Sequence, residues 1–354
     1  MIVFFERKFP TLKLLLAVIL ISIGQPAFAQ STSIPNSISF IPIFQPIDVT
    51  ADSNYIFVIH NTCSLGKNYQ HGIGSESYCP GFTSMYCFGN YQSEVLSIDK
   101  SGEENVIASL PSPFDCYQKD HIAIASGLGG FQKDRLYIAQ GSWSGTNIWS
   151  TNIHGSGMTL FKADNHPLGS DVHITFDTTG TFGYAMIISG GNEVWKITSE
   201  GKSSLLAEIP IRGHHGGEGI GGVAVAPLDF GQYGGDLLVP DSGTGNIFAI
   251  SPNLTLQKIT FKSGASEIIF VPPNTCTFGN RETTFLSSYA SDNDGSVVMY
   301  PERDFAGLGG DALIADQYNP SLVILTSNNN TLTIKEFQSN IDTQFLEGSG
   351  FVQC

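Results

Sequence analysis

The chain shows almost no helical periodicity, and this absence limits the folds that are open to it. Apolar residues rarely recur at the three- and four-residue spacing of an amphipathic helix. Short runs rich in Val, Ile, Phe and Tyr recur instead, separated by Gly, Asn, Asp and Ser. Strands without helices exclude helical and α/β folds and leave a sandwich, a barrel or a propeller.

Positive charge is scarce as well. The chain has 17 Lys and Arg residues against 32 Asp and Glu residues, which gives a formal net charge of −15. A surface of this sign repels nucleic acid and anionic lipid. We therefore expect no nucleic-acid partner, and we expect a small molecule, a glycan or a protein as the ligand.

Long apolar runs are missing everywhere except near the N-terminus. There "LLLAVILISIG" follows Arg7, Lys8 and Lys13 and precedes the small-residue site Ala27-Phe28-Ala29. This pattern predicts a secretory signal peptide, and the run is too short for a membrane span. We expect cleavage near Ala29/Gln30, so that 1–29 is the signal and 30–354 is one secreted or periplasmic domain without a membrane anchor. The oligomeric state stays open, with a monomer expected.

A strand-rich unit repeats along the chain. "DFGQYGGDLLVPDSGTGNIFAISPNLTLQKITF" from Asp229 aligns with "DFAGLGGDALIADQYNPSLVILTSNNNTLTIKEF" from Asp304, and weaker copies occur elsewhere, with a partial one from Phe285. One more apolar strand accompanies each unit, as in "IDVTAD", "HIAIAS", "HITFDTTG", "GVAVAP", "EIIFVPP" and "GSGFVQ". Four-stranded sheets that repeat in this way bury both faces when they are stacked around an axis. The repeat predicts an all-β propeller of six blades, with five or seven as alternatives.

This pattern resembles six-bladed propellers of the NHL and gluconolactonase-like group. The features that carry the resemblance are an apolar inner strand, a Gly/Asp turn, and second strands of the "LYIA" or "LLVPD" type. Gluconolactonase-like propellers have a Glu-Gly pair at the start of an inner strand, and its glutamate binds a divalent metal. Glu218-Gly219 and Glu347-Gly348 are similar to that pair, so the resemblance implies a metal near the propeller axis.

Ionisable residues stand at or just before the starts of the inner strands. Adjacent strands of a meander alternate in direction, so these starts lie on one face, together with the links that lead into them. The link "RGHHGGEGIGG" (212–222) adds His214, His215 and Glu218. Imidazoles and carboxylates that converge on an axis suit a divalent cation. The expected ligands of such an ion, calcium or zinc, are Asp48, His121, His173, His215, Glu218 and Glu267. The alternative is a polar, water-filled channel.

All six cysteines lie beyond the signal segment, and an even number in an exported chain favours disulfides. A long insertion in the first blade, about 61–93, holds Cys63, Cys79 and Cys87, and Cys116 lies in the next link on the same face. Their pairing is open, and a zinc site is the alternative. Cys276 and Cys354 each follow an inner strand on the opposite face, so we expect them to pair with each other.

No G-x-S-x-G, H-E-x-x-H, P-loop or C-x-x-C motif occurs, so an enzymatic role stays undecided. The G-x-G-x-x-G match in 217–222 precedes a strand and not a helix, which excludes a dinucleotide fingerprint. The first hypothesis is an exported propeller that binds a ligand over the face carrying the insertion, with the disulfide-stapled insertion as its specificity element. The alternative is a divalent-metal-dependent hydrolase or lactonase.

Overall fold

The computed structural model describes most of the chain after residue 38. The described residues are 39–43, 46–64, 90–111, 119–142, 144–164, 168–211, 219–279, 283–290, 295–316, 321–328, 331–338 and 345–354. The chain divides into two units, Met1–Asn36 and Ser37–Cys354, and every described residue belongs to the second. The predicted signal segment and most of the predicted insertion therefore lie outside the described residues.

The described residues form strands and two 3-10 turns, η2 (Gly231–Tyr233) and η3 (Glu302–Phe305), and contain no α-helix. No helix in this part of the chain is long and apolar enough to cross a membrane. The strands are β1 (Ser39–Pro42), β2 (Pro46–Asp52), β3 (Tyr55–Ser64), β4 (Asn90–Asp99), β5 (Glu104–Ser109), β6 (Lys119–Ile124), β7 (Arg135–Ser142), β8 (Gly145–Asn152), β9 (Thr159–Asp164), β10 (Asp171–Phe176), β11 (Met186–Gly190), β12 (Glu193–Ile197), β13 (Ser203–Glu208), β14 (Ala224–Val225), β15 (Leu237–Pro240), β16 (Asn246–Ile250), β17 (Leu256–Phe261), β18 (Ala265–Phe270), β19 (Thr283–Ala290), β20 (Gly295–Pro301), β21 (Ala312–Asp316), β22 (Ser321–Asn328), β23 (Thr331–Gln338) and β24 (Phe345–Gln353).

Most of these strands form antiparallel meanders of four. The first meanders are sequential: β2 to β5, β6 to β9, β10 to β13, and β14 to β17. Parallel pairing of the inner strands β6 and β10 joins two meanders into one eight-stranded sheet, and parallel pairing of β2 and β24 joins two more groups. These parallel contacts are short: β6 and β10 pair at their first residues, and β2 and β24 pair at their last residues.

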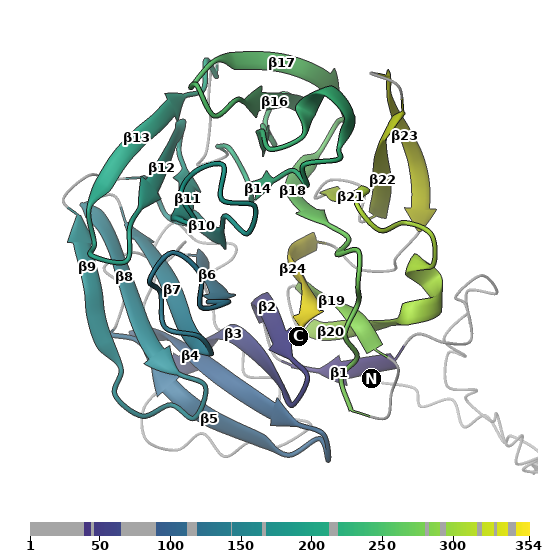
Figure 1. Ribbon diagram of the computed structural model, residues 1–354. Coiled ribbons are helices and arrows are strands. Elements are labelled where there is room, and N and C mark those ends of the chain that lie inside the picture. The colour runs from purple at the N-terminus through teal and green to yellow at the C-terminus, as the bar shows by residue number, and fades with distance from the viewer. Residues whose placement is uncertain are drawn as a thin grey trace, which may run out of the picture. The chain divides into compact units, whose positions relative to one another are not determined.

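The inner strands close into a cycle. β2 contacts β6, β6 contacts β10, β10 contacts β14, β14 contacts β18, β18 contacts β24, and β24 contacts β2. Figure 1 shows these strands around the middle of the unit, with β5, β9, β13, β17 and β23 at its perimeter. Four-stranded sheets arranged radially around a closed cycle of inner strands define a β-propeller.

Burial explains why these sequences form inner and outer strands. The inner half of each meander is rich in Val, Ile, Leu and Ala, and β15 and β21 are buried at every position. The outermost strands β9 and β17 have no fully buried residue. The cores lie between adjacent sheets: Tyr137 and Ala139 of β7 pack with Met186 and Ile188 of β11. Each sheet thus covers the face that its neighbour exposes.

The chain leaves sequential order near its C-terminus. After β18 it forms the hairpin β19–β20, which pairs with β24, and only then returns to β21, β22 and β23 beside β18. The outermost strand of the β24–β19–β20 group is β1, from the N-terminal end of the unit. The partial repeat that begins at Phe285 therefore lies in a different sheet from the strands that flank it in sequence.

The structure contains the disulfide Cys276–Cys354 expected from the sequence, with a Cα–Cα distance of 5.5 Å and a sequence separation of 78. It ties the end of β24 to the segment between β18 and β19. A disulfide indicates an oxidising compartment. The side chains of Cys63, Cys79, Cys87 and Cys116 lie outside the described residues, so their pairing stays a prediction.

We expect the Cys276→Ala/Cys354→Ala double variant to lose about 2–4 kcal/mol of unfolding free energy, because the unfolded chain loses a long-range constraint. Urea denaturation of the two proteins measures this difference. Mass spectrometry of the non-reduced wild type provides the control. An unchanged unfolding free energy, or a peptide that links Cys276 to an insertion cysteine, would contradict the proposed closure.

Candidate functional site

Polar side chains gather where the inner strands begin. They come from β2, β6, β10, β18 and β24, and a glycine stands at the equivalent place before β14. These residues are Asp48, His121, Asp171, His173, Gly222, Glu267 and Ser349. Asp48, His121, His173 and Ser349 are buried, and Asp171 and Glu267 are half-buried. We call this set the axial cluster.

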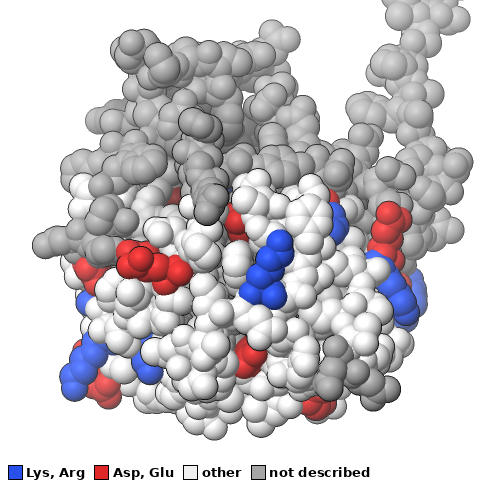
Figure 2. Space-filling view, turned by 90° about the horizontal axis from the view of Figure 1, so that it is seen from above, with Lys and Arg blue, Asp and Glu red and all other residues white. Residues whose placement is uncertain are grey.

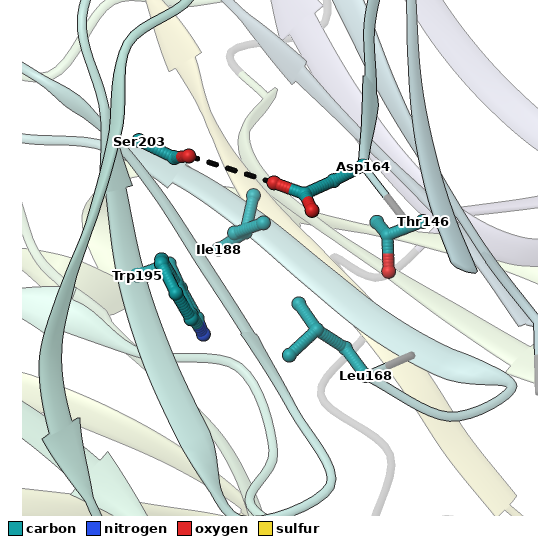
Figure 3. Close-up of a pocket in the computed structure, with 6 residues that line it drawn as sticks. All are labelled: Thr146, Asp164, Leu168, Ile188, Trp195 and Ser203. Atoms are coloured by element: carbon teal, nitrogen blue, oxygen red, sulfur yellow. Dashed lines mark hydrogen bonds between the residues drawn. The ribbon is translucent and has the colours of Figure 1, made fainter. Parts of the chain in front are cut away.

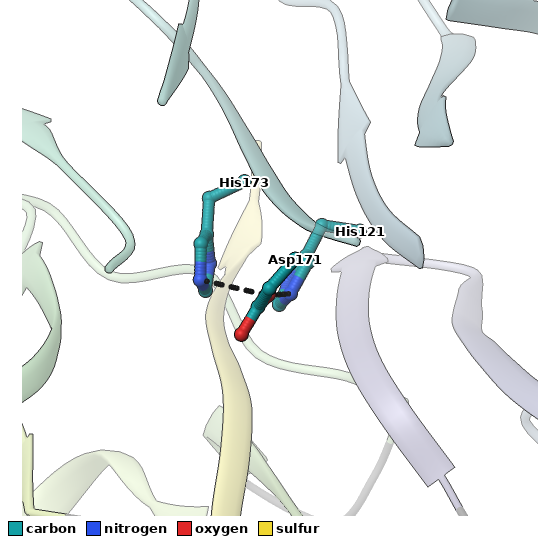
Figure 4. A group of neighbouring side chains, drawn as sticks. All are labelled: His121, Asp171 and His173. Atoms are coloured by element: carbon teal, nitrogen blue, oxygen red, sulfur yellow. Dashed lines mark hydrogen bonds and ion pairs between the residues drawn. The ribbon is translucent and has the colours of Figure 1, made fainter. Parts of the chain in front are cut away.

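Asp171 lies between two histidines (Figure 4). Its Oδ1 is 3.0 Å from His121 Nε2 and 3.2 Å from His173 Nε2. The imidazole centroids are 3.7 Å apart, with an interplanar angle of 34°. One ligand atom from each of these three residues lies within 4.8 Å of the others, which is close enough to hold one metal ion. The group combines two imidazoles with one carboxylate.

Asp48 orients His121 from the other side. Its Oδ2 is 3.3 Å from His121 Nδ1 and accepts the backbone N–H of Ile122 at 2.9 Å. Its Oδ1 accepts the backbone N–H of Val49 at 2.7 Å. Each carboxylate oxygen therefore has a backbone donor, and the bond to Ile122 joins β2 to β6 where these strands have no ladder pairing. Such a carboxylate holds an imidazole ring in one orientation.

Glu267 and Ser349 complete the cluster on the side away from β6. The Ser349 hydroxyl donates to Glu267 Oε2 at 2.7 Å, which links β24 to β18. A Cβ at Gly222 would lie 2.8 Å from Glu267 Cγ and 3.2 Å from His173 Nδ1. Glycine is required at this position for close packing, because any side chain would displace one of these neighbours.

The charges in the cluster influence one another strongly. Burial disfavours the charged form of His121, but hydrogen bonds to Asp171 and Asp48 outweigh this effect and raise its pKa to about 10. Burial, together with the charge of His121, lowers the pKa of His173. Burial opposes ionisation of Asp171, yet the charges of His173 and Lys119 hold the pKa of that carboxyl well below its usual range.

Glu267 shifts in the opposite direction. Burial and the nearby charge of Asp48 raise the pKa of Glu267 to about 8, although the Ser349 hydrogen bond favours the ionised form. At neutral pH the cluster therefore holds an imidazolium at His121, a carboxylate at Asp171, and a protonated carboxyl at Glu267. Opposite charges lie in contact, which reduces the cost of burying them.

The structure brings together several of the residues expected from the sequence. Asp48, His121, His173 and Glu267 lie in the axial cluster, although Asp48 and Glu267 lie beside the three-residue metal-ligating group and not in it. His214, His215 and Glu218 lie outside the described residues, so their part in a site stays a prediction. The side chain of Glu347 also lies outside the described residues.

Sequence reasoning missed Asp171, Ser349 and Lys119. The signal for the first was present, because Asp171 precedes His173 by two positions and therefore shares its side of the strand. The same spacing relates Lys119 to His121. Nothing local marks Ser349, because its contact with Glu267 joins residues far apart in the chain.

A hollow lies between the β6–β9 and β10–β13 meanders (Figure 3). It is lined by Thr146, Asp164, Leu168, Ile188, Trp195 and Ser203. The Ser203 hydroxyl donates to Asp164 Oδ2 at 3.5 Å, which links β13 to β9 across it. The indole N–H of Trp195 donates to Glu193 at 2.8 Å. We interpret this hollow as a packing gap between sheets.

No protein-family model matches the chain, and no curated protein matches its sequence. Among solved structures, a nidogen/laminin complex is 12% identical, with a TM-score of 0.47, over 87% of this chain and 86% of that chain. Virginiamycin B lyase from Staphylococcus aureus is 13% identical, with a TM-score of 0.45, over 86% and 90%. A putative 6-phosphogluconolactonase from Bacteroides fragilis is 14% identical, with a TM-score of 0.36, over 70% and 78%.

These likenesses agree with the expected resemblance to NHL-like propellers. TM-scores below 0.5 carry no argument about the fold or the function of this chain. The assignment of this protein to the β-propellers therefore rests on its own cycle of inner strands. The chemistry of its axial cluster is likewise inferred from its own residues.

Protonation of the axial cluster makes the stability of the metal-free protein depend on pH. His121 has a pKa of about 10 in the folded protein against an ordinary value of 6.5, so its contribution is present below pH 6.5 and is lost as the pH rises toward 10. Glu267 acts in the same direction, from its ordinary value of 4.5 up to about 8. We therefore expect the unfolding free energy to fall between about pH 6 and about pH 9.5.

Urea denaturation in the presence of a chelator measures this loss. The His121→Gln variant should be less stable than the wild type at the lower pH and should lose less of its stability on going to the higher pH. Equal unfolding free energies of the wild type at the two pH values would show that the cluster does not hold these protons.

Proposed function

We propose that this chain is an exported six-bladed propeller that binds one divalent transition-metal ion in its axial cluster and, through it, a ligand over the same face. The observation that carries the proposal is the His121–Asp171–His173 group at the start of two inner strands. The ligand is a small molecule or an exposed group of a glycan or protein. The insertion of 61–93, most of which lies outside the described residues, is proposed as its specificity element.

The strand groups support the proposed count of six blades. Each four-stranded group supplies one inner strand to the cycle, and β24, β19, β20 and β1 form the last group. In this interpretation the N-terminal strand and the C-terminal strand share one blade. That arrangement closes the propeller with both chain ends and accounts for the position of β1 at an outer edge.

The chemistry of the donors favours zinc or a similar ion over calcium. Calcium prefers six to eight oxygen ligands, whereas two imidazole nitrogens and one carboxylate suit zinc and its neighbours. Three protein ligands leave a coordination position for an exogenous group. Asp48, at His121 Nδ1, stands where metal-bound histidines usually have a carboxylate partner. His121 must lose the proton at Nε2 to bind a metal, so the affinity should fall at low pH.

A hydrolase or lactonase is the second candidate. An ion with an open position supplies Lewis acidity toward a carbonyl oxygen. Glu267 favours this candidate, because a carboxyl with a pKa of about 8 is protonated at neutral pH and suits general-acid chemistry. Ser349 holds that carboxyl in place. The proposed binding of a metal ion and a ligand does not depend on hydrolysis.

We expect the purified protein to bind one zinc ion that a chelator removes. His173→Ala and Asp171→Ala should each weaken zinc binding by more than about 100-fold, because each removes a ligand, whereas Asp48→Asn should cost about 10- to 100-fold, because it removes a partner of a ligand. Isothermal titration calorimetry and metal analysis provide the measurement.

His154→Ala is the matched control, since His154 is exposed in the turn between β8 and β9. Unchanged zinc affinity in both His173→Ala and Asp171→Ala would refute the proposed site. A parallel loss in the control would point to unspecific binding by surface histidines.

A further inference from the structure

Six equivalent positions near the starts of the inner strands lie in a circle, and one of them has no side chain. They are Asp48, His121, His173, Gly222, Glu267 and Ser349. Asp48 contacts His121, and the imidazole centroids of His121 and His173 are 3.7 Å apart. Ser349 bonds Glu267 on the other side. Gly222, between His173 and Glu267, contributes only backbone atoms.

The backbone at Gly222 is fixed from both sides. Its N–H and its carbonyl each form a hydrogen bond of 2.9 Å with the backbone of β18, where it pairs in parallel with Glu267. On the other side, Ser189 of β11 stands opposite His173 and donates its hydroxyl to the Gly221 carbonyl at 2.9 Å. The link before β14 is thus held between the hairpin that carries His173 and the strand that carries Glu267.

The side chains of His173 and Glu267 approach each other over Gly222. A Cβ at Gly222 would lie 3.2 Å from His173 Nδ1 and 2.8 Å from Glu267 Cγ, so both atoms are close to one point. The other ring nitrogen, Nε2, faces Asp171 at 3.2 Å. Within the described part of the chain, His173 Nδ1 has no hydrogen-bond partner.

A metal ion bound at Nε2 would leave the imidazole proton of His173 on Nδ1, where it needs an acceptor. Asp171 faces Nε2 and is one of the proposed metal ligands. Asp48 is engaged by His121 and by two backbone N–H groups. Glu267 is the remaining carboxyl group of the axial cluster, and it lies on the Nδ1 side of His173.

We propose that Glu267 is a positioning residue for the metal site, which accepts a hydrogen bond from His173 Nδ1 in the metal-loaded protein. This inference rests on the proposed metal site and adds a residue that acts through a ligand. The carboxyl group has room for the bond, because an ionised carboxyl group has about four lone-pair sites and Ser349 occupies only some of them. Each ligating imidazole then has its own carboxyl partner, since Asp48 stands at the other histidine.

Nitrogen-15 NMR of the zinc-loaded protein tests this contact, because an Nδ1–H signal responds to its hydrogen-bond acceptor. We expect Glu267→Leu to shift the Nδ1–H signal of His173, or to lose it to solvent exchange, and to leave the signal of His121 unchanged. This variant should also weaken zinc binding about 10- to 100-fold. Gly222→Ala removes no polar group and places a methyl group between the two side chains, so it should shift the His173 signal alone.

Asp48→Asn is the matched control. It changes the carboxyl partner of the other histidine, so it should shift the His121 signal and leave the His173 signal unchanged. Acidic side chains elsewhere set the background for zinc binding, and Figure 2 shows them in small separate groups on a largely uncharged described surface. Glu104→Leu makes the same substitution at the exposed start of β5 and should leave zinc affinity and both signals unchanged.

An unchanged His173 signal in Glu267→Leu, or equal shifts of both histidine signals, would overturn the inference and leave the metal site intact. Glu267→Gln keeps the size of the side chain and an acceptor oxygen, so it should shift the His173 signal in the same direction by less. If the leucine variant does not fold, an unchanged His173 signal in Glu267→Gln overturns the inference instead. Failure of the wild type to bind zinc would overturn the proposed function and this inference with it.

Discussion

The closed cycle of inner strands is the constraint on which the rest of the structure depends. β24 lies between β2 and β19, and this position joins the last strand of the chain to the first complete meander. Closure places the starts of all the inner strands around one axis. It therefore brings side chains from distant parts of the sequence into contact, and the Cys276–Cys354 disulfide reinforces it at the end of β24.

Closure also explains why the axial cluster is polar. Near their starts, several inner strands lie next to each other without continuous ladder pairing. Backbone groups there therefore need other hydrogen-bond partners. Asp48 satisfies the N–H of Ile122, and the Ser349–Glu267 bond joins β24 to β18. The carboxylates thus serve as links between strands and also hold the histidines. Buried charge is tolerated because each charged group has a partner of opposite sign or a hydrogen-bond donor.

The site could be predicted in part because its residues lie at or near the starts of recognisable strands. Asp48, His121, His173 and Glu267 were found by aligning the inner strands, and all of them lie in the axial cluster. The alignment does not identify Asp171 and Lys119. It compares one position in each strand and leaves out the residue two positions earlier, which lies on the same side of the strand. The sequence does not predict to which sheets β19, β20 and β21 belong, because strand pairing across a long loop leaves no local pattern.

The sequence by itself determined the all-β class, the inner strands with their apolar residues, and the expected pairing of Cys276 with Cys354. These properties follow from residue type and from a period of two, which are local. Only the tertiary structure decided that Asp171 lies between two imidazoles, that Asp48 supports one of them, and that Lys119 forms an ion pair with Asp171. Those contacts depend on the parallel approach of β6 and β10 and on the closure of the cycle. The physical reason is that such packing depends on distances between separate segments, which no single stretch of sequence encodes.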